Sequence, residues 1–337
     1  MLYRNRRSTI TPPIVAIVIA VTALASLVWG APAAADPSAP KLRFVEHLGA
    51  NLWSATAYSE SMKSEIPLQV IRPAGTNSDA PTLYLLNGAG GGEDGANWID
   101  QTDAAAFFAA KNINVVIPTK GIGSYYTNWI ATDPKIGRPQ WQTFLTRELP
   151  EIVDASLNTN GRNAIAGLSM SATSVLSLAE SAPQVYRSVA SYSGCARTSN
   201  AEGQAAVRSI VHIASGADAS NMWGPPSSPH WRANDPYVNA AKLRGLSIYI
   251  SAGSGLPGAY DTPDQQAPGA PPIANQIVVG GALEAAARRC TQDMVARLRQ
   301  LNIPAVVNLP TTGTHSWRYW QDALHHSWPT IAAGLRS

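Results

Sequence analysis

The alternation of short apolar, β-branched runs with longer helical patterns is the feature that most constrains this chain. The runs predicted to be strands cover residues 68–72, 82–86, 114–118, 163–166, 188–192, 247–252 and 305–309. The predicted helices cover residues 103–111, 141–156, 170–181, 280–301 and 317–335. Strands interleaved with helices predict an α/β fold, in which helices cover both faces of a mostly parallel sheet. The chemistry of such sheets lies in loops at the carboxyl ends of the strands.

Two segments interrupt this alternation. Residues 217–236 are rich in Trp, Pro, Ser and Asn, and residues 253–279 are rich in Gly, Pro and Ala. Compact domains rarely contain such long connections without a use for them. We therefore expect ordered loops over the functional site, or an insertion.

Residues 1–35 have the order of a secretory signal. Three arginines near the start precede an apolar run at 14–28, and small residues then lead to Ala33-x-Ala35. The apolar run is shorter than the roughly 20 residues that span a bilayer, so we expect cleavage near Ala35 rather than an uncleaved anchor. The exported part, residues 36–337, is long enough for one large domain with a deep core.

The net charge of the exported part is close to zero. The whole chain carries +3, and residues 1–35 contain three arginines and no acid, which leaves 3 − 3 = 0. The rest of the chain has no block of Lys and Arg that would attract a polyanion. We therefore expect no nucleic-acid partner.

Two cysteines, Cys195 and Cys290, both lie in the exported part. An even number of cysteines in an oxidising compartment favours a disulfide bond between them. No His or Cys pair has the spacing of metal ligands, so we expect no metal site.

A strand-to-helix turn at residues 167–171, Gly-Leu-Ser-Met-Ser, contains the candidate nucleophile Ser169. A nucleophile elbow needs small residues two positions before and after the serine, because strand and helix approach closely there. Gly167 meets this need, and Ser171 replaces the second glycine of the usual G-x-S-x-G pattern. The alternative is a serine that caps the following helix.

A serine nucleophile needs a base and an acid, which follow it along the chain in the order acid, then histidine. His315 lies after the last predicted strand and before the last predicted helix, where this order places the base. For the acid, position alone leaves Asp261, Asp264 and Glu284 open. Together these residues predict an α/β-hydrolase fold and a serine acyl-transfer enzyme.

The oxyanion of such a reaction is held by two backbone amides. One belongs to the residue after the nucleophile, Met170, and the other to the glycine-rich segment 87–92, which follows the strand at 82–86. This segment also overlaps a dinucleotide pattern, Gly90-x-Gly92-x-x-Gly95. However, no acidic residue for a ribose follows the next strand, so we expect no cofactor.

Several separated motifs resemble the antigen 85 type mycolyltransferases and their corynebacterial-type relatives. They are YLLNG at 84–88, WQTFLTRELP at 141–150, GLSMSA at 167–172, MWGP at 222–225, NDP at 234–236 and GTHSWRYW at 313–320. The resemblance covers most of the exported chain. It implies transfer of a mycolyl group from trehalose monomycolate to another hydroxyl in the cell envelope.

The resemblance also implies roles for particular residues. It selects Glu284 as the acid, because Leu283-Glu284 with Arg288 matches the family's pattern, and it assigns the oxyanion amides to Ala89 and Met170. The other expected substrate contacts are Asn87, Gly90, Arg288, Ser316 and Trp317, and tryptophans 223, 231 and 317 are expected to shield the site and stack on sugar.

Two departures from the family's pattern affect these expectations. An acidic residue and an arginine contact trehalose in the antigen 85 enzymes, whereas this chain has Asn87 and Gly90 there. The acceptor therefore stays open between trehalose, arabinan and a protein hydroxyl. The family's cysteine pair is also missing, and a Cys195–Cys290 bond would instead tether the helix at 280–301 beside the site.

Two other functions use the same scaffold. A secreted carboxylesterase or lipase would have the same three residues with water as acceptor. A non-catalytic surface binding protein on a hydrolase scaffold would need a broken triad, and the sequence shows an intact one.

Overall fold

The computed structural model describes residues 41–75, 79–266 and 272–336, which belong to one compact unit. The predicted signal segment, residues 1–35, lies outside the described residues. No helix within the described ranges is long and apolar enough to cross a membrane.

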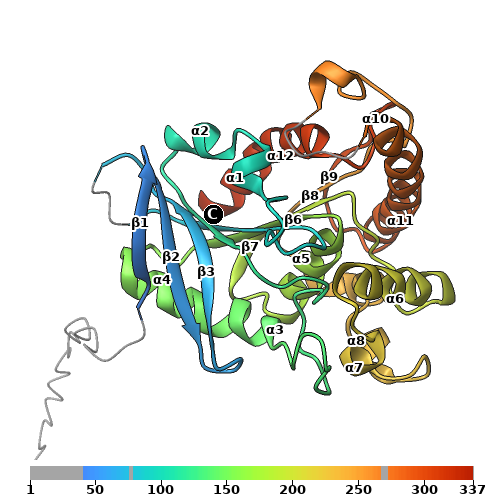
Figure 1. Cartoon of the computed structure of the whole chain (residues 1–337), viewed down its shortest axis with the longest axis horizontal. Helices are drawn as coiled ribbons and strands as arrows, with labels where there is room; N and C mark the ends of the chain where they lie inside the picture. Colours follow the sequence, from blue (N-terminus) through green and yellow to red (C-terminus); the bar gives the residue numbers. More distant parts are fainter. Residues whose placement is uncertain (1–40, 76–78, 267–271, 337) are drawn as a thin grey trace, which may run out of the picture. The chain divides into compact units, whose positions relative to one another are not determined.

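A nine-stranded sheet forms the centre of the molecule, in the order β1-β2-β3-β5-β4-β6-β7-β8-β9 (Figure 1). The strands are β1 (Arg43–Gly49), β2 (Leu52–Ser59), β3 (Ser64–Ile71), β4 (Thr82–Leu86), β5 (Asn114–Pro118), β6 (Asn163–Leu168), β7 (Tyr186–Tyr192), β8 (Ser247–Ser251) and β9 (Val306–Asn308). Strands β4 to β9 are parallel, and β1 to β3 form an antiparallel meander that joins β5. All seven predicted strands are present. The sequence prediction missed β1 and β2, since β1 is an almost wholly exposed edge strand and β2 beside it is only partly buried.

Helices connect the parallel strands. They are α1 (Trp98–Gln101), α2 (Ala104–Ala109), α3 (Trp141–Thr143), α4 (Leu149–Leu157), α5 (Met170–Ser181), α6 (Ala201–Ser215), α7 (Ala219–Trp223), α8 (Pro229–Ala233), α9 (Pro236–Asn239), α10 (Ile273–Asn275), α11 (Gly281–Gln300) and α12 (Trp317–Arg336). A π-helical turn, η1 (Phe144–Glu148), joins α3 to α4, and a second one, η4 (Gln276–Gly280), runs directly into α11. The five predicted helices are present, and α6 is the longest of the helices that were not predicted.

Each face of the sheet has its own apolar core. Along β4, Leu83 and Leu85 belong to one core, whereas Tyr84 and Leu86 belong to the other, because successive side chains of a strand point to opposite faces. Helices α1, α2 and α12 lie above the sheet in Figure 1, and α3 and α4 lie below it. This two-sided burial explains why the parallel strands are continuous apolar runs.

The strand order reverses beside β4. The chain passes from β4 to β5 on one side of it, and β6 then pairs with β4 on the other side. Ligands of open α/β sheets bind at such a switch point, outside the carboxyl ends of the strands. The segments that follow β4 and β6 begin at Asn87 and Ser169, so the fold brings the two predicted parts of the site together.

Candidate active site

The turn between β6 and α5 holds Ser169 in a strained conformation. Its φ is 55° and its ψ is −120°, and its N–H donates to the carbonyl of Tyr192 at 2.9 Å. The side chain makes no capping hydrogen bond to α5, which excludes the helix-cap alternative. Non-glycine residues adopt positive φ at a cost, which surrounding structure must offset. The turn instead directs the hydroxyl toward His315.

The contacts of Ser171 explain why a serine stands where the usual pattern has its second glycine. Its hydroxyl accepts from the N–H of Leu168 at 3.0 Å and lies 3.2 Å from the carbonyl of Leu86 and 3.0 Å from that of Leu168. The side chain therefore ties the end of β6 to the end of β4. Gly167 leaves the room for it, because a Cβ at Gly167 would collide with the Ser171 side chain.

Three predicted residues form one hydrogen-bonded chain. Nε2 of His315 lies 2.8 Å from Oγ of Ser169, and Nδ1 lies 2.7 Å from Oε2 of Glu284. Because the carboxylate accepts at Oε2, Nδ1 carries the ring proton and Nε2 accepts from Ser169. Glu284 is 1% exposed and His315 14% exposed, so the pair is shielded from water. This is the geometry that an activated serine requires.

The second oxygen of Glu284 is held as firmly as the first. Oε1 accepts from the hydroxyl of Ser193 at 2.7 Å and from the N–H of Gly253 at 2.5 Å. Ser193 in turn accepts from the indole N–H of Trp320 at 3.0 Å. Ser193 is not among the residues predicted from the sequence, although its position directly after the carboxyl end of β7 is a usable signal.

The two aspartates that competed for the role of acid do not bind the ring of His315, whose two nitrogens contact Glu284 and Ser169. Asp261 is buried and accepts hydrogen bonds from Thr314, Tyr319, Gln276 and the N–H of Gly258. Burial alone would raise the pKa of Asp261, but these hydrogen bonds outweigh it and hold the pKa below its ordinary value. Asp261 thus anchors the segment before His315, and Asp264 is exposed.

Three residues of helix α11, one of which is Glu284, bind the segments that follow β7, β8 and β9. Arg288 donates to the carbonyls of Ala252, Leu309 and Pro310. Cys290 forms a disulfide bond with Cys195, with an S–S distance of 2.07 Å. The disulfide prediction is confirmed. The guanidinium of Arg288 binds the backbone that follows β8 and β9, and the substrate contact expected of Arg288 stays a prediction.

The prediction for Asn87 also needs correction. Its side chain is fully buried, and its amide donates to the carbonyl of Pro118 at 2.9 Å while accepting from the N–H of Trp98 at 3.2 Å. Asn87 therefore braces the segment after β4 and has no contact left for a sugar. Gly90 lies in the cavity wall with Asp94, whose carboxylate occupies the space beside the missing side chain.

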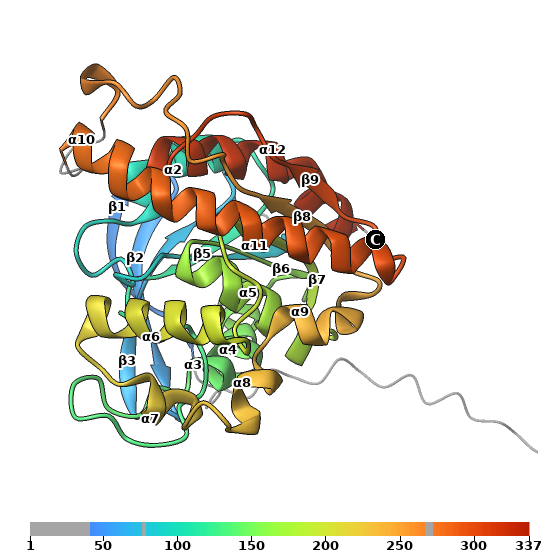
Figure 2. The same cartoon turned by 90° about the vertical axis from the view of Figure 1, so that its right-hand side faces the viewer.

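An apolar cavity of about 730 Å³ opens at Ser169 and His315. Ala89 and Met170, the predicted oxyanion residues, lie in its wall. The cavity extends between α6 and α11, which run side by side in Figure 2. The helix side chains that line it are mostly aliphatic: Ala206, Val207, Ile210, Ile213 and Ala214 from α6, and Leu283, Ala286 and Ala287 from α11.

A second cleft of about 300 Å³ lies on the other side of His315. It contains the predicted residues Ser316 and Trp317, and the half-buried indole of Trp317 packs edge-on against Trp98 and Trp320. Polar side chains gather there: Gln101, Gln265, Asn275, Gln276 and Arg318. Within the described parts of the chain, no three His, Cys, Asp or Glu side chains form a group that could hold a metal ion.

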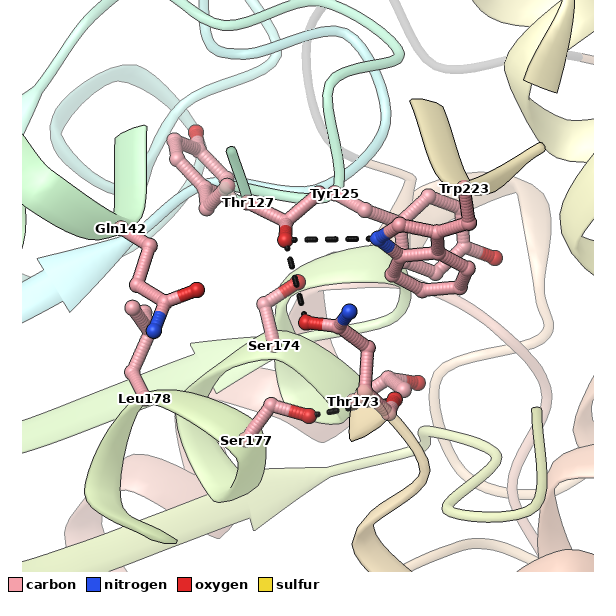
Figure 3. Close-up of a pocket in the computed structure, with 10 residues that line it drawn as sticks. Tyr125, Thr127, Gln142, Thr173, Ser174, Ser177, Leu178 and Trp223 are labelled. Carbon is pink, nitrogen blue, oxygen red and sulfur yellow. Dashed lines mark hydrogen bonds between the residues drawn. The ribbon is translucent and has the colours of Figure 1, made fainter. Parts of the chain in front are cut away.

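The segment at 217–236 does not cover the site. It forms α7 and α8, and Trp223 and Trp231 are buried in the core, so neither can stack on a sugar. Figure 3 shows the indole N–H of Trp223 at the hydroxyl of Thr127, which also contacts Asn234. These contacts enclose a cavity of about 10 Å³, room for about one water molecule. The segment thus braces the wall of the site from behind.

Comparisons with known proteins agree with this geometry. The family model described as "Putative esterase" matches residues 59–331. The diacylglycerol acyltransferase/mycolyltransferase Ag85A of Mycobacterium leprae is 32% identical over 285 residues, which cover 81% of this chain and 80% of that protein. Ag85B of the same organism is 32% identical over 320 residues, covering 91% of this chain and 89% of the relative.

Solved structures support the same assignment. Mycobacterium tuberculosis MPT51 (FbpC1) superposes with a TM-score of 0.68 at 26% identity, over 82% of this chain and 96% of that one. An S-formylglutathione hydrolase from Agrobacterium tumefaciens shares the fold, with a TM-score of 0.62 at 15% identity over 86% and 98% of the two chains. The predicted fold and the predicted resemblance are confirmed. The chain belongs to the esterase family of the α/β-hydrolase fold and, within it, to the family of the Ag85 diacylglycerol acyltransferases/mycolyltransferases.

Proposed function

We propose that this protein is a serine acyltransferase that moves a mycolyl group from trehalose monomycolate to a hydroxyl of a second trehalose monomycolate or of another cell-envelope molecule. One observation carries the proposal: two cavities meet at His315, a larger one walled by the aliphatic side chains of α6 and α11 (the apolar cavity) and a smaller one that contains amide side chains, Arg318 and the indole of Trp317 (the polar cleft). The apolar cavity suits a long acyl chain, and the polar cleft suits a sugar. A transferase needs both cavities beside one catalytic base. The sugar that leaves and the sugar that accepts the acyl group react at the same acyl carbonyl.

The proposed site for the acyl chain depends on how α6 is anchored. Gly203 packs so closely on the carbonyl of Arg197 that a Cβ would collide with it, and at the other end Ser215 also packs closely on Gly123. Between these two anchors, α6 bridges the cavity and supplies aliphatic side chains to it. A wall of this kind stabilises an alkyl chain by about 25 cal/mol per Å² of apolar surface removed from water.

The sugar side rests on the polar cleft. Amide side chains and an arginine there can donate to and accept from hydroxyl groups, and the indole of Trp317 offers an apolar ring face. Asp94 adds a carboxylate beside Gly90 at the mouth of the apolar cavity. The sugar contacts therefore come from the segment before α11 and from Ser316 to Arg318, not from Asn87.

The first half of the reaction forms an acyl-enzyme. Nε2 of His315 takes the proton of Ser169 as Oγ attacks the ester carbonyl, and the N–H groups of Ala89 and Met170 hold the oxyanion. Collapse of the tetrahedral intermediate breaks the bond to the trehalose oxygen, which receives the proton from His315. Glu284 keeps the imidazole in the required tautomer and stabilises its protonated form.

The second half reverses these steps with a new alcohol. An acceptor hydroxyl in the polar cleft gives its proton to His315 and attacks the acyl-enzyme carbonyl, and Ser169 recovers its proton. Transfer exceeds hydrolysis where a sugar occupies the cleft and excludes water. We place this reaction outside the cytoplasm, which the order of residues 1–35 and the Cys195–Cys290 bond both support.

The test uses trehalose monomycolate as donor and compares the wild type with Ser169→Ala. We expect trehalose dimycolate and free trehalose from the wild type, and neither from the variant. Free mycolic acid and trehalose as the only products, without trehalose dimycolate, would identify an esterase instead. Failure of an active-site serine probe to label Ser169 would indicate a binding protein on this scaffold.

A further inference from the structure

The charge of the polar cleft distinguishes it from the apolar cavity. With His315 neutral, Arg318 is the one charged side chain among the described residues that line the cleft, and the other polar groups there are amides, a hydroxyl and an indole. No carboxylate belongs to this lining. The apolar cavity, by contrast, has three carboxylates in its wall, those of Asp94, Glu202 and Asp293. A sugar bound in the cleft therefore meets a single positive charge.

The guanidinium of Arg318 is half-buried and has no partner of its own. Within the part of the chain that the structure describes, it forms no ion pair and donates no hydrogen bond. Two other arginines of this region, Arg288 and Arg197, bind backbone carbonyls and Asp293. Arg318 is the second residue of α12, where a positive charge opposes the helix dipole and does not stabilise the helix. The fold thus gives this cation no structural task.

The carboxylates nearest in sequence to the cleft are already engaged. Asp322, one turn beyond Arg318 on α12, accepts from the hydroxyl of Tyr260 at 2.9 Å and lines a different cavity. Asp261 accepts hydrogen bonds from four donors. Asp264 is exposed and accepts from an amide of the cleft at 3.1 Å. A charge that is partly removed from water is costly unless it is paired, so the cleft lacks an anion.

A second unused donor lines the same cleft. The indoles of Trp98 and Trp320, which pack edge-on against Trp317, both donate hydrogen bonds, whereas the indole N–H of Trp317 donates to no group in the described ranges. Trp317 and Arg318 are within three residues of His315, the base that activates the acceptor. A guanidinium matches the geometry of a carboxylate or a phosphate, and an indole N–H can add a further hydrogen bond.

We propose that the preferred acceptor carries an anionic group, a carboxylate or a phosphate, near the sugar hydroxyl that takes the acyl group, and that Arg318 binds this group. The inference rests on the proposed function, because it specifies the class of acceptor within it. The hydroxyl gives its proton to Nε2 of His315 and attacks the acyl carbonyl, the bond to Oγ of Ser169 breaks, and Ser169 recovers the proton. The anionic group only positions the acceptor. A neutral sugar lacks this contact and is the weaker acceptor.

Competition between acceptors tests the proposal. The donor is p-nitrophenyl butyrate, and the acceptors are glucose, glucuronate and glucose 6-phosphate, which share one ring and differ in charge. Mass spectrometry of the butyrylated sugars gives kcat/KM of transfer for each acceptor. The wild type is compared with Arg318→Gln and with Arg289→Gln. Arg289 is the matched control, because it is an arginine close to the site that lines the apolar cavity instead of the cleft.

The wild type is expected to acylate at least one of the two anions about tenfold more efficiently than glucose, a difference of about 1.4 kcal/mol. The anion that is preferred identifies the group that Arg318 binds. Arg318→Gln should lose the preference, and Arg289→Gln should keep it. Equal transfer to all three sugars by the wild type would overturn the proposal. A preference that persists in Arg318→Gln would overturn it as well.

Binding to Ser169→Ala, followed by tryptophan fluorescence, separates this proposal from the proposed function. If the wild type only hydrolyses the donor with every sugar, the proposed function fails. Tighter binding of an anionic sugar than of glucose, abolished when Arg318→Gln is added to Ser169→Ala, would still support the anion site. Binding of all three sugars with the same affinity, or of none, would overturn the anion site whatever the outcome of transfer.

Discussion

The hydroxyl of Ser193 donates a 2.7 Å hydrogen bond to Oε1 of Glu284, the oxygen that faces away from His315. Ser193 follows β7, which lies between the strands that lead to Ser169 and to Gly253. Three neighbouring parallel strands thus hold the nucleophile and fix the carboxylate behind its base. The position of Glu284 is therefore set by the sheet as well as by its own helix.

Ser193→Ala should lower kcat for a short-chain ester by about 10- to 100-fold while leaving KM nearly unchanged. A hydrogen bond to a charged group is worth about 1.5–3 kcal/mol, and its loss lets the carboxylate rotate away from His315. Steady-state kinetics would measure this. Ser191→Ala is the matched control, because Ser191 lies on β7, two residues before Ser193, and donates to the carbonyl of Ala172. Wild-type kcat in Ser193→Ala would show that Gly253 alone positions Glu284.

Ser171→Ala should destabilise the protein by about 1–3 kcal/mol, because it leaves the buried N–H of Leu168 without its acceptor. Chemical denaturation would measure the change. Ser174→Ala is the control, since Ser174 donates to the carbonyl of Met170 one turn earlier on the same helix and its loss leaves no N–H unpaired. Equal stability of the two variants would contradict the tie between β4 and β6.

The sequence allowed prediction of those parts of the site that local context determines. Ser169 sits in a strand–turn–helix pattern and His315 between a last strand and a last helix, so each had a recognisable setting. The choice of Glu284 over Asp261 needed the family resemblance, because the acid comes from a helix and meets the histidine only through the packing of α11.

The sequence could not predict the direction in which several side chains point. Asn87 and Arg288 are in the predicted segments, yet both side chains turn toward backbone carbonyls. Trp223 and Trp231 looked like sugar-stacking residues in a loop, but they are buried. Position along a chain does not report which way a side chain points. The edge strand β1 and its neighbour β2 escaped prediction because little apolar surface there is buried.

Asp261→Asn should remove the contribution that the ionised carboxylate of Asp261 makes to the stability of the protein. The wild type loses this contribution as the pH becomes acidic. The folded-state pKa of Asp261 is lowered, so its contribution is complete above the unfolded value of about 3.9 and is lost as pH falls through the folded value. Thermal melts between about pH 5 and pH 2 should show the wild type losing stability more steeply than the variant. Parallel curves would mean that the hydrogen bonds from Thr314 and Tyr319 do not favour the ionised form.

Glu180→Gln should stabilise the protein at neutral pH by about 1–3 kcal/mol. Glu180 is buried, and its Oε1 has no hydrogen-bond partner among the described residues. Burial raises its pKa well above the ordinary value, an effect that Lys242 opposes and Asp235 reinforces. A raised folded-state pKa means that stability falls as pH rises from about 4.3 toward that value.

Thermal melts between about pH 4 and pH 8 would measure this effect. The variant should gain most at the highest pH and little at the lowest. Glu46→Gln, which changes an exposed carboxylate in the same way, should show no such trend. A variant that is less stable than the wild type at neutral pH would contradict the account of Glu180.

The central claim is that Ser169 carries the acyl group between two alcohols. Intact-mass spectrometry after a short incubation with trehalose monomycolate, in the absence of an added acceptor, tests it most directly. The wild type should gain the mass of one mycolic acid less one water, localised to Ser169, and should lose it again when trehalose is added. Ser169→Ala should show no adduct while melting like the wild type. An adduct of the same mass on Ser169→Ala, or one on the wild type that trehalose does not remove, would contradict the account.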